Sequence, residues 1–541
     1  MEDITAKRYE NGHPKLRRFH QARWDEPLIF ELGRAGERGV LPPPAEDEIR
    51  AVAGDVVGAL PEALRRPDPP GLPEVAQPQV VRHYLRLSQE NLGLDFNVDI
   101  GQGTCTMKYS PKINERLAAM PKLTAVHPLQ PTETSQGILE VLYRFERILC
   151  EISGMDRFSL QPGAGSAAIY GAASIIRAAH AERGEAAQRR EIITTIFSHP
   201  SDAACAKAAG FDIVTLYPDE GGYPDLDALK AAVSERTAGL MIANPEDTGI
   251  YNPRIAEWVR IVHEAGGLCF YDQANANGIL GVTRARDAGF DLCHFNLHKT
   301  FSTPHGCGGP GAGALGVAEE LAPFLPSPVV TFDGEQYGLD DDRPRSIGKL
   351  RAFYGVAGAV LKAYAWVMSL GAEGLLEASR TAVLNNNYLL KLMREIPGVE
   401  APYAAGRHRI EQVRYSWQEL CRETGVTSED IGLRAADYGV HYWTSHHPFV
   451  VPEPCTLEPT ESFSKADLDE YAAILRRVAD EARTDPDLVR TAPHHSTVHR
   501  ADHEPLDDPA QWAVTWRAYL KKRTSVPERP PDGPPEEVDD A

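Results

Sequence analysis

The chain has 541 residues, of which 42% are hydrophobic and 25% charged, as is usual for a globular protein of two or three domains. A net charge of −21 disfavours binding to nucleic acid or to an anionic membrane. The polar start and the lack of a long uncharged apolar run predict a cytoplasmic protein without a membrane span. Eight scattered cysteines without C-x-x-C spacing predict neither a disulfide scaffold nor a metal site.

The first 80 residues do not have the pattern of a domain. Residues 28–78 are rich in proline, glycine and charge, and the runs Leu41-Pro42-Pro43-Pro44 and Arg66-Pro67-Asp68-Pro69-Pro70 separate short helical pieces. We therefore expect residues 1–80 to form an arm that wraps a neighbour. After them comes a glycine-rich loop, Gly101–Pro111, whose small and hydroxyl side chains suit either a ligand-binding loop or an ordinary connection.

Between residues 140 and 320, strand-like runs alternate with amphipathic helices, which is typical of an α/β domain built on a mostly parallel sheet. Apolar positions at helical spacing, such as Ile255, Trp258, Val259 and Val262, predict helices on both faces of that sheet. The domain should extend from residue 81 to 330. The predicted strands are Glu191–Phe197, Phe211–Leu216, Gly239–Ala243, Gly267–Asp272 and Asp291–Leu297.

A run of small residues, Gln161–Ser166, leads directly into a helical pattern at Ala167–Ala178. The free backbone amides at a helix start can hold a phosphate group, so Gly165 and Ser166 are candidate cofactor-binding residues. The signal is weak by itself and gains weight from two residues in the same domain.

Those residues are Asp272 and Lys299, each of which follows a buried strand. One crossover and one return strand separate them, so both could emerge at neighbouring strand ends. A buried lysine there can form an imine, and a carboxylate beside a pyridine nitrogen keeps that nitrogen protonated. The pair therefore predicts pyridoxal 5'-phosphate (PLP) as cofactor. The alternative is that Asp272 only caps the loop after its strand.

Beyond a proline-rich join near residue 326, a helical stretch over about Leu350 to Arg394 and a mixed segment predict a smaller α+β domain at residues 331–485. Residues 486–541 form an extension rich in histidine, acid and proline. Its last fifteen or so residues cannot bury enough apolar surface to order themselves, so we expect them to be mobile.

Motifs spread along the chain resemble one known family. They are Leu28–Leu32, Val81–Gln89, Cys105–Tyr109, His127–Pro131, Asn296–Thr300 and Glu458–Glu461. With these the chain resembles glycine dehydrogenase (decarboxylating) subunit 2, the PLP-bearing subunit of the glycine cleavage system P-protein.

The resemblance implies the aspartate aminotransferase architecture, PLP fold type I, with a mostly parallel sheet of the seven-stranded type. It implies that Lys299 carries PLP, that Asp272 pairs with the pyridine nitrogen and that His199 stacks on the cofactor ring. His298 and Thr300 flank the lysine and are further candidates for cofactor binding, although His298 can equally hydrogen-bond loop backbone. Lys299, His298 or His305 could transfer protons at the substrate, and their spacing does not rank them.

The implied reaction is the decarboxylation of glycine and transfer of the aminomethyl group to the lipoyl arm of H-protein. The implied partners are subunit 1 and H-protein, in a heterotetramer or with this chain as a homodimer. Since this fold type usually completes its site by dimerisation, Thr106 and Lys108 could contact substrate or phosphate across a subunit boundary, or could simply belong to a buried loop.

Three segments depart from the family pattern. Ala164–Ile169 replaces A-G-A-x-G-E, Ser198–Ala206 keeps the histidine of A-H-G-T-N-P-A-S-A but loses most of its surroundings, and Asn244–Gly249 differs from N-P-N-T-x-G. These differences leave two alternatives: a stand-alone PLP enzyme for another amino acid or amine, or a partner subunit without turnover.

Overall fold

The computed structural model describes residues 9–10, 13–37, 39, 43–68, 71–101, 108–305, 309, 311–444, 450–497, 499–500, 508, 512–513 and 515–523. By contacts the chain divides into two units, Met1–Thr497 and Val498–Ala541. The predicted divisions at residues 80, 330 and 485 stay predictions, and the expectation for the final residues lies outside the described residues. None of the helices in the described part is long and apolar enough to cross a bilayer.

A seven-stranded sheet in the order β3-β9-β8-β7-β6-β4-β5 forms the centre of the first unit. Only β9 runs against its two neighbours, so the sheet is mostly parallel, as predicted. The strands are β3 (Arg157–Ser159), β4 (Glu191–Thr195), β5 (Asp212–Leu216), β6 (Thr237–Ala243), β7 (Leu268–Gln273), β8 (Leu292–Asn296) and β9 (Gly313–Val317).

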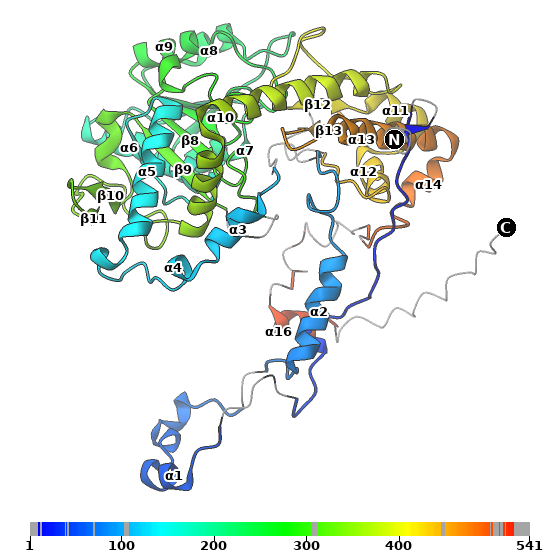
Figure 1. Ribbon diagram of the computed structural model, residues 1–541. Helices are drawn as coiled ribbons and strands as arrows, with labels where there is room; N and C mark the ends of the chain where they lie inside the picture. Colours follow the sequence, from blue (N-terminus) through cyan, green and yellow to red (C-terminus); the bar gives the residue numbers. More distant parts are fainter. Residues whose placement is uncertain are drawn as a thin grey trace, which may run out of the picture. The chain divides into compact units, whose positions relative to one another are not determined.

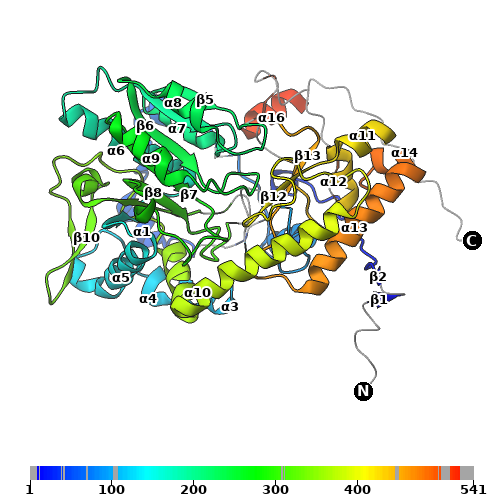
Figure 2. The ribbon, with the colours of Figure 1, turned by 90° about the horizontal axis from the view of Figure 1, so that it is seen from above.

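Helices cover both faces of this sheet (Figure 2). On one face α6 (Gly165–Glu182) and α7 (Pro200–Ala208) pack against a cluster that includes Ile176 and Phe270. On the other face α5 (Gln136–Ser153), α8 (Leu226–Ala232), α9 (Ile255–Glu264) and the first part of α10 pack around Trp258 and Phe295. The predicted α9 positions Ile255, Trp258, Val259 and Val262 are all buried.

The helix α10 (Ala357–Arg394) runs from the sheet toward the strands β12 (Val413–Ser416) and β13 (Pro454–Leu457) (Figure 1). It contains one non-helical residue, Gly371 at φ 65°. The predicted start of this helix at Leu350 was wrong. Phe353 (φ 60°) and Gly355 (φ 114°) adopt left-handed conformations, and the Gly355 Cα lies against the Leu160 carbonyl, so the chain cannot be helical before residue 356.

The second half of α10 packs against the small ladder β12 (Val413–Ser416) and β13 (Pro454–Leu457) and against three helices. Val98 and Ile100 join this hydrophobic cluster from far upstream. The helices are α11 (Gln418–Thr424), α12 (Ser428–Ala436) and α13 (Lys465–Thr484).

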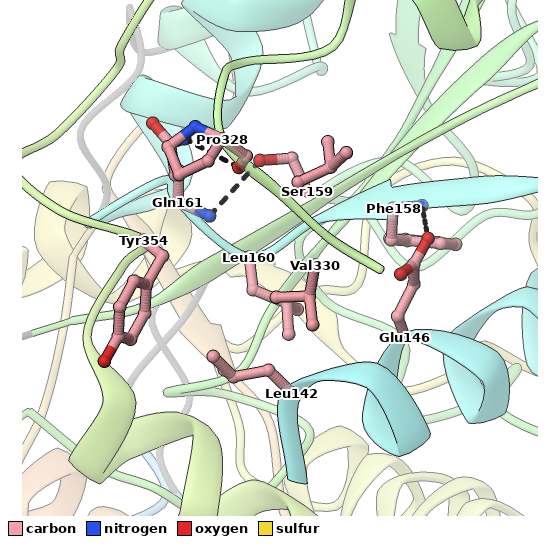
Figure 3. A pocket seen from close by; sticks show the side chains of 10 residues that line it. Leu142, Glu146, Phe158, Ser159, Leu160, Gln161, Pro328, Val330 and Tyr354 are labelled. Carbon is pink, nitrogen blue, oxygen red and sulfur yellow. Dashed lines mark hydrogen bonds between the residues drawn. The ribbon is translucent and has the colours of Figure 1, made fainter. Parts of the chain in front are cut away.

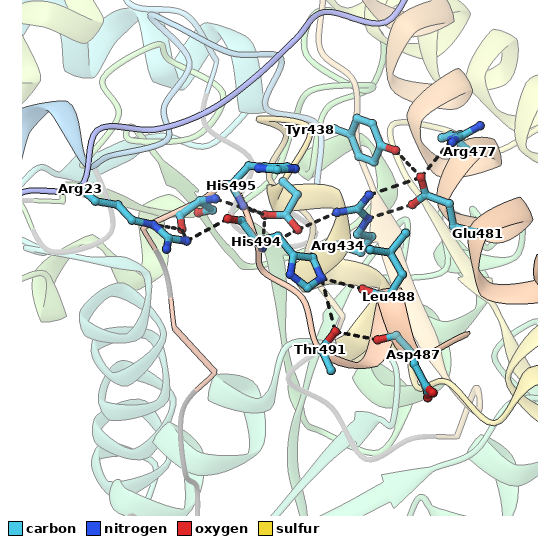
Figure 4. A network of polar contacts seen from close by, with 12 residues as sticks. Arg23, Arg434, Tyr438, Arg477, Glu481, Asp487, Leu488, Thr491, His494 and His495 are labelled. Atoms are coloured by element: carbon cyan, nitrogen blue, oxygen red, sulfur yellow. Dashed lines mark hydrogen bonds and ion pairs between the residues drawn. The ribbon is translucent and has the colours of Figure 1, made fainter. Parts of the chain in front are cut away.

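A buried polar network fixes the segment after α14 (Pro486–Arg490) onto α12 and α13 (Figure 4). Arg434 donates to Glu481 at 2.8 Å and to Asp437 at 3.0 Å. Asp437 in turn accepts the backbone N–H groups of residues 494, 495 and 496.

The structure describes further α-helices and strands. They are β1 (Tyr9–Glu10), β2 (His13–Pro14), α1 (Asp47–Ala53), α2 (Gln77–Gln89), α3 (Lys112–Ala118), α4 (Pro121–Thr124), β10 (Val329–Phe332), β11 (Tyr337–Asp340) and α16 (Trp516–Arg523).

Candidate active site

Lys299, Asp272 and His199 lie around one pocket at the carboxyl edge of the sheet. Lys299 follows β8, Asp272 lies near the end of β7, and His199 follows β4. These strands run parallel, so their carboxyl ends meet at one edge of the sheet. The sequence placed the lysine and the acid at neighbouring strand ends, and the structure brings them together. The other lining residues are Ala243, Pro245, Asp247, Ala274, Asn275, Glu411 and Gln412.

Lys299 lies in a tight turn directly after β8, with its backbone N–H donating to the Asn296 carbonyl at 3.1 Å. The residue is 3% exposed. Within the described ranges, no hydrogen bond or ion pair is formed by its Nζ. A buried amine without a partner is poised for covalent chemistry with a carbonyl group.

Asp272 is held from two sides. Its Oδ1 accepts the Ala274 N–H at 2.8 Å and lies 3.5 Å from Nδ1 of His294. The sheet register places His294 of β8 directly beside Asp272 of β7. Burial lowers the pKa of His294, so that ring is neutral and stacks on Phe270.

His199 is the N-cap of α7, and its Nδ1 accepts the Ser201 backbone N–H at 3.1 Å. Because Nδ1 accepts, the proton of the neutral ring is on Nε2. The cap therefore fixes both the tautomer and the orientation of a ring that lines the pocket. Its stacking on a cofactor ring stays a prediction.

The helix α6 begins at Gly165, two residues before the predicted start at Ala167, and its N-cap residue Ala164 provides no side-chain hydrogen bond. Ser166 Oγ lies 3.0 Å from Ser201 Oγ of α7. A Cβ on Gly165 would lie 2.7 Å from the Asn296 amide nitrogen, so only glycine lets α6 approach the end of β8 this closely.

His298 and Thr300, beside the lysine, are bonded to backbone. His298 Nδ1 lies 3.0 Å from the Ala312 carbonyl, and burial lowers the pKa of its ring to about 3, so the ring is neutral. Thr300 Oγ1 accepts the Ala276 N–H at 2.9 Å and thereby holds the loop after β7 against the lysine turn. Any contact with a cofactor stays a prediction for both residues.

The three candidate substrate residues have different positions. Thr106 lies outside the described residues. Lys108 is buried, with its Nζ 2.9 Å from a Glu461 oxygen and 4.8 Å from the centre of the Trp366 ring. His305 lies edge-on to His298 at 4.8 Å between ring centres, and burial lowers its pKa. A role toward substrate stays a prediction for each of them.

Sequence reasoning missed four residues near the site. Asp202, on α7, contacts Asp272. Glu411 lines the pocket, and burial and then Glu458 raise the pKa of its carboxyl group well above the usual value. His294 stands beside Asp272, and the Arg351 guanidinium lies over Gly163 before α6. A polar residue inside the apolar run of β8 was a signal for His294, whereas the chain offers no local signal for Arg351.

These residues fit PLP. The pocket combines an unpaired buried amine, a held carboxylate and a histidine of fixed orientation, as an imine-forming aldehyde with a pyridine ring requires. The start of α6 at Gly165 and Ser166 offers free backbone N–H groups, and the Arg351 guanidinium lies beside Gly163, so a phosphate could be held there by both.

Two other places in the described part do not compete with this site. A small cavity between α5, β3 and β10 is mostly apolar, and its acid, Glu146, is bonded to Arg157 and to the Phe158 N–H (Figure 3). His263, Cys269 and Asp291 lie within 4.8 Å of one another, yet an Arg286 nitrogen 3.7 Å from Asp291 disfavours a metal cation there.

The sequence matches known families over much of its length. Residues 170–335 match Aminotransferase class-V, and residues 378–503 match Glycine dehydrogenase, C-terminal domain. A protein of Pyrococcus abyssi named probable glycine dehydrogenase (decarboxylating) subunit 2 is 45% identical over 518 residues, 94% of this chain and 99% of that protein. A protein of the same name from Aeropyrum pernix is 42% identical over 515 residues, 93% of this chain and 98% of that protein.

Solved structures share the architecture. Glycine decarboxylase (P-protein) of the glycine cleavage system, in inhibitor-bound form, matches with a TM-score of 0.68 at 21% identity, covering 81% of this chain and 100% of that chain. A sphingosine-1-phosphate lyase of Burkholderia pseudomallei matches with a TM-score of 0.57 at 15% identity, covering 82% and 97%. These likenesses confirm the predicted fold type I architecture.

Proposed function

Because the chain belongs to the glycine dehydrogenase (decarboxylating) subunit 2 family, we propose that it decarboxylates glycine with PLP and transfers the aminomethyl group to the lipoyl arm of H-protein. The observation that carries the proposal is the single pocket shared by Lys299, Asp272 and His199. PLP, when bound, supplies an electron sink for the pair of electrons left by the departing carboxylate.

Different residues of the pocket would hold different parts of that cofactor. Lys299 would hold its aldehyde carbon, Asp272 would face its ring nitrogen, and the start of α6 with Ser166 would hold its phosphate. His199, fixed by its cap, would pack on the ring. The near-complete burial of Lys299 and Asp272 excludes water from the point where charge develops.

Lys299, His298 and His305 are the side chains to consider for proton transfer at the substrate. The Lys299 amine is unpaired within the described residues, and His298 and His305 are kept neutral by burial and by the lysine. His298 uses Nδ1 at the Ala312 backbone, and with a pKa of about 3 its ring is too weak a base to take up a proton at neutral pH. His305 is only half-buried and, with Lys299, is the better candidate for moving a proton.

The assembly we propose is a heterotetramer with subunit 1, with H-protein as a transient partner. The arm, residues 1–80, supports it, because apolar side chains of the described part of the arm, among them Val52, Leu64 and Leu72, are exposed in the single chain. The six described cysteines are free thiols, which supports a reducing, cytoplasmic location.

The test is the exchange of labelled bicarbonate into glycine by the chain reconstituted with subunit 1, PLP and lipoylated H-protein. Exchange is expected, and Lys299→Ala should abolish it together with the label that borohydride fixes on the protein. Lys391→Ala, an exposed lysine of α10, is the matched control and should keep both. Absence of exchange in the unaltered chain, with borohydride labelling intact, would turn the proposal toward another amine substrate.

A further inference from the structure

Asp202 is a buried acid beside the cofactor-facing carboxylate. It is the third residue of α7, one turn after the His199 cap, and it is 0% exposed. Its carboxyl group contacts that of Asp272, and in the described structure neither of its oxygens finds a donor. The helix thus presents two side chains to the site, a ring at its start and an acid one turn later.

Two carboxyl groups in contact in a dry site cannot both be ionised. Burial first, and then the charges of Asp272 and Asp247, raise the pKa of Asp202 well above its usual range. Two ionised carboxylates have no hydrogen to share, whereas a protonated Asp202 can donate its O–H to Asp272. The contact therefore becomes a hydrogen bond only when Asp202 keeps its proton.

The surrounding groups do not neutralise a second negative charge. Asp247 is paired with Arg414 at 3.1 Å, and His294, on the other side of Asp272, is a neutral ring. On α7 itself, burial raises the pKa of the Cys205 thiol to about 11, so it is uncharged as well.

We propose that Asp202 is a positioning residue that keeps its proton and donates it to Asp272, so that the pair presents one negative charge to the PLP ring nitrogen. This inference rests on PLP being the cofactor of the proposed function. The donated hydrogen bond fixes the rotamer of Asp272 from the α7 side, as the Ala274 N–H does from the loop side. One carboxylate then matches one pyridinium charge.

The variants Asp202→Asn and Asp202→Leu both keep a side chain of similar size at this position, but only the asparagine keeps a hydrogen-bond donor. The amide of Asn still donates to Asp272, so this variant should bind PLP within about threefold of the unaltered chain at neutral pH. Leu has no donor, and loss of a hydrogen bond to a buried carboxylate should weaken PLP binding by about 10- to 100-fold. PLP affinity is measured by absorbance titration of the apo protein. Equal affinities for all three proteins would overturn the proposal.

Glu246→Gln is the matched control, because Glu246 is also a buried acid with a raised pKa but is influenced by Thr195, Asp247 and Arg414 rather than by Asp272. It should leave PLP affinity unchanged. An equal loss of affinity in this control would show a general effect of buried acids and would count against a specific role for Asp202.

If the Leu variant does not fold, an infrared measurement on the apo protein tests the protonation of Asp202 independently. The difference spectrum between the unaltered chain and Asp202→Asn should contain the carbonyl band of a protonated carboxylic acid at neutral pH. A carboxylate band in its place would contradict the proposal. Since this readout needs no cofactor, it can succeed while PLP binding fails, in which case the proposed function falls and the protonation of Asp202 stands.

Discussion

Buried acids at the carboxyl edge of the sheet link the pH of the solution to the stability of this protein. Glu246 is fully buried, and burial raises its pKa from 4.5 to about 8. A raised pKa means that the folded state holds the proton more tightly than the unfolded state. The stability that this proton provides is complete below about pH 4.5 and is lost as the pH rises through about 8.

We therefore expect Glu246→Gln to unfold like the unaltered chain at pH 5 and to be more stable than it at pH 9. The rise in pKa corresponds to a difference of at most about 5 kcal/mol between the two proteins in the free energy of unfolding at pH 9. Urea unfolding of the apo protein at the two pH values measures the difference. A gain at pH 5 as large as that at pH 9 would mean that the glutamine acts by packing and not by removing a titrating group.

Arg414 and Asp247 form a buried ion pair across the pocket edge, at 3.1 Å with both side chains almost fully buried. Arg414→Met leaves Asp247 without its arginine in a dry site, and we expect a loss of about 3 to 5 kcal/mol in the free energy of unfolding.

Adding Asp247→Asn to that variant should restore much of the loss, because the buried charge disappears. The four proteins form a double-mutant cycle, measured by urea unfolding. Additive effects of the two substitutions would show that the pair is not energetically coupled.

At the scale of the element, two of the three glycines in α10 have opposite backbone requirements. Gly371 has φ 65° and ψ −177° inside the helix, a conformation that residues with a Cβ rarely adopt, whereas Gly358 is helical. No atom lies within 4 Å of a Cβ built at either position, so packing does not distinguish them.

Gly371→Ala should cost about 1 to 3 kcal/mol through backbone strain, and Gly358→Ala should gain about 0.5 to 1 kcal/mol. Thermal unfolding of both variants checks the contrast in one helix. If both alanines stabilise the protein, the break at Gly371 is not maintained by the surrounding packing.

At the scale of the whole molecule, the arm carries apolar surface that the single chain leaves in water. Val52 is 90% exposed and Leu64 77% exposed. The ends of this segment are already held together, since Arg34 N–H donates to the Glu74 carbonyl at 3.0 Å.

Deletion of residues 41–72 should therefore leave the thermal midpoint of the isolated chain unchanged and abolish its complex with subunit 1 in sedimentation. Glu62→Gln, within the same segment, should keep the complex. A complex that survives the deletion would assign the exposed apolar residues to some other contact.

The sequence by itself determined the family, the alternation of strands and helices and the lysine and acid of the site. These features depend on local periodicity and on motifs whose residues are neighbours in the chain. Strand ends were less certain. The strand predicted at Glu191–Phe197 ends at Thr195, because Ser198 N–H turns back to the Thr195 carbonyl.

Only the tertiary structure decided what surrounds those residues. Asp202 reaches the site from α7, Arg351 from the loop before α10 and Glu411 from the segment before β12. These three segments lie far apart in the chain. Their charge states depend on burial and on neighbours that the parallel strand ends bring together. A linear sequence does not contain the dielectric surroundings of a side chain, so it could supply the lysine and the aspartate but not the shared proton beside them.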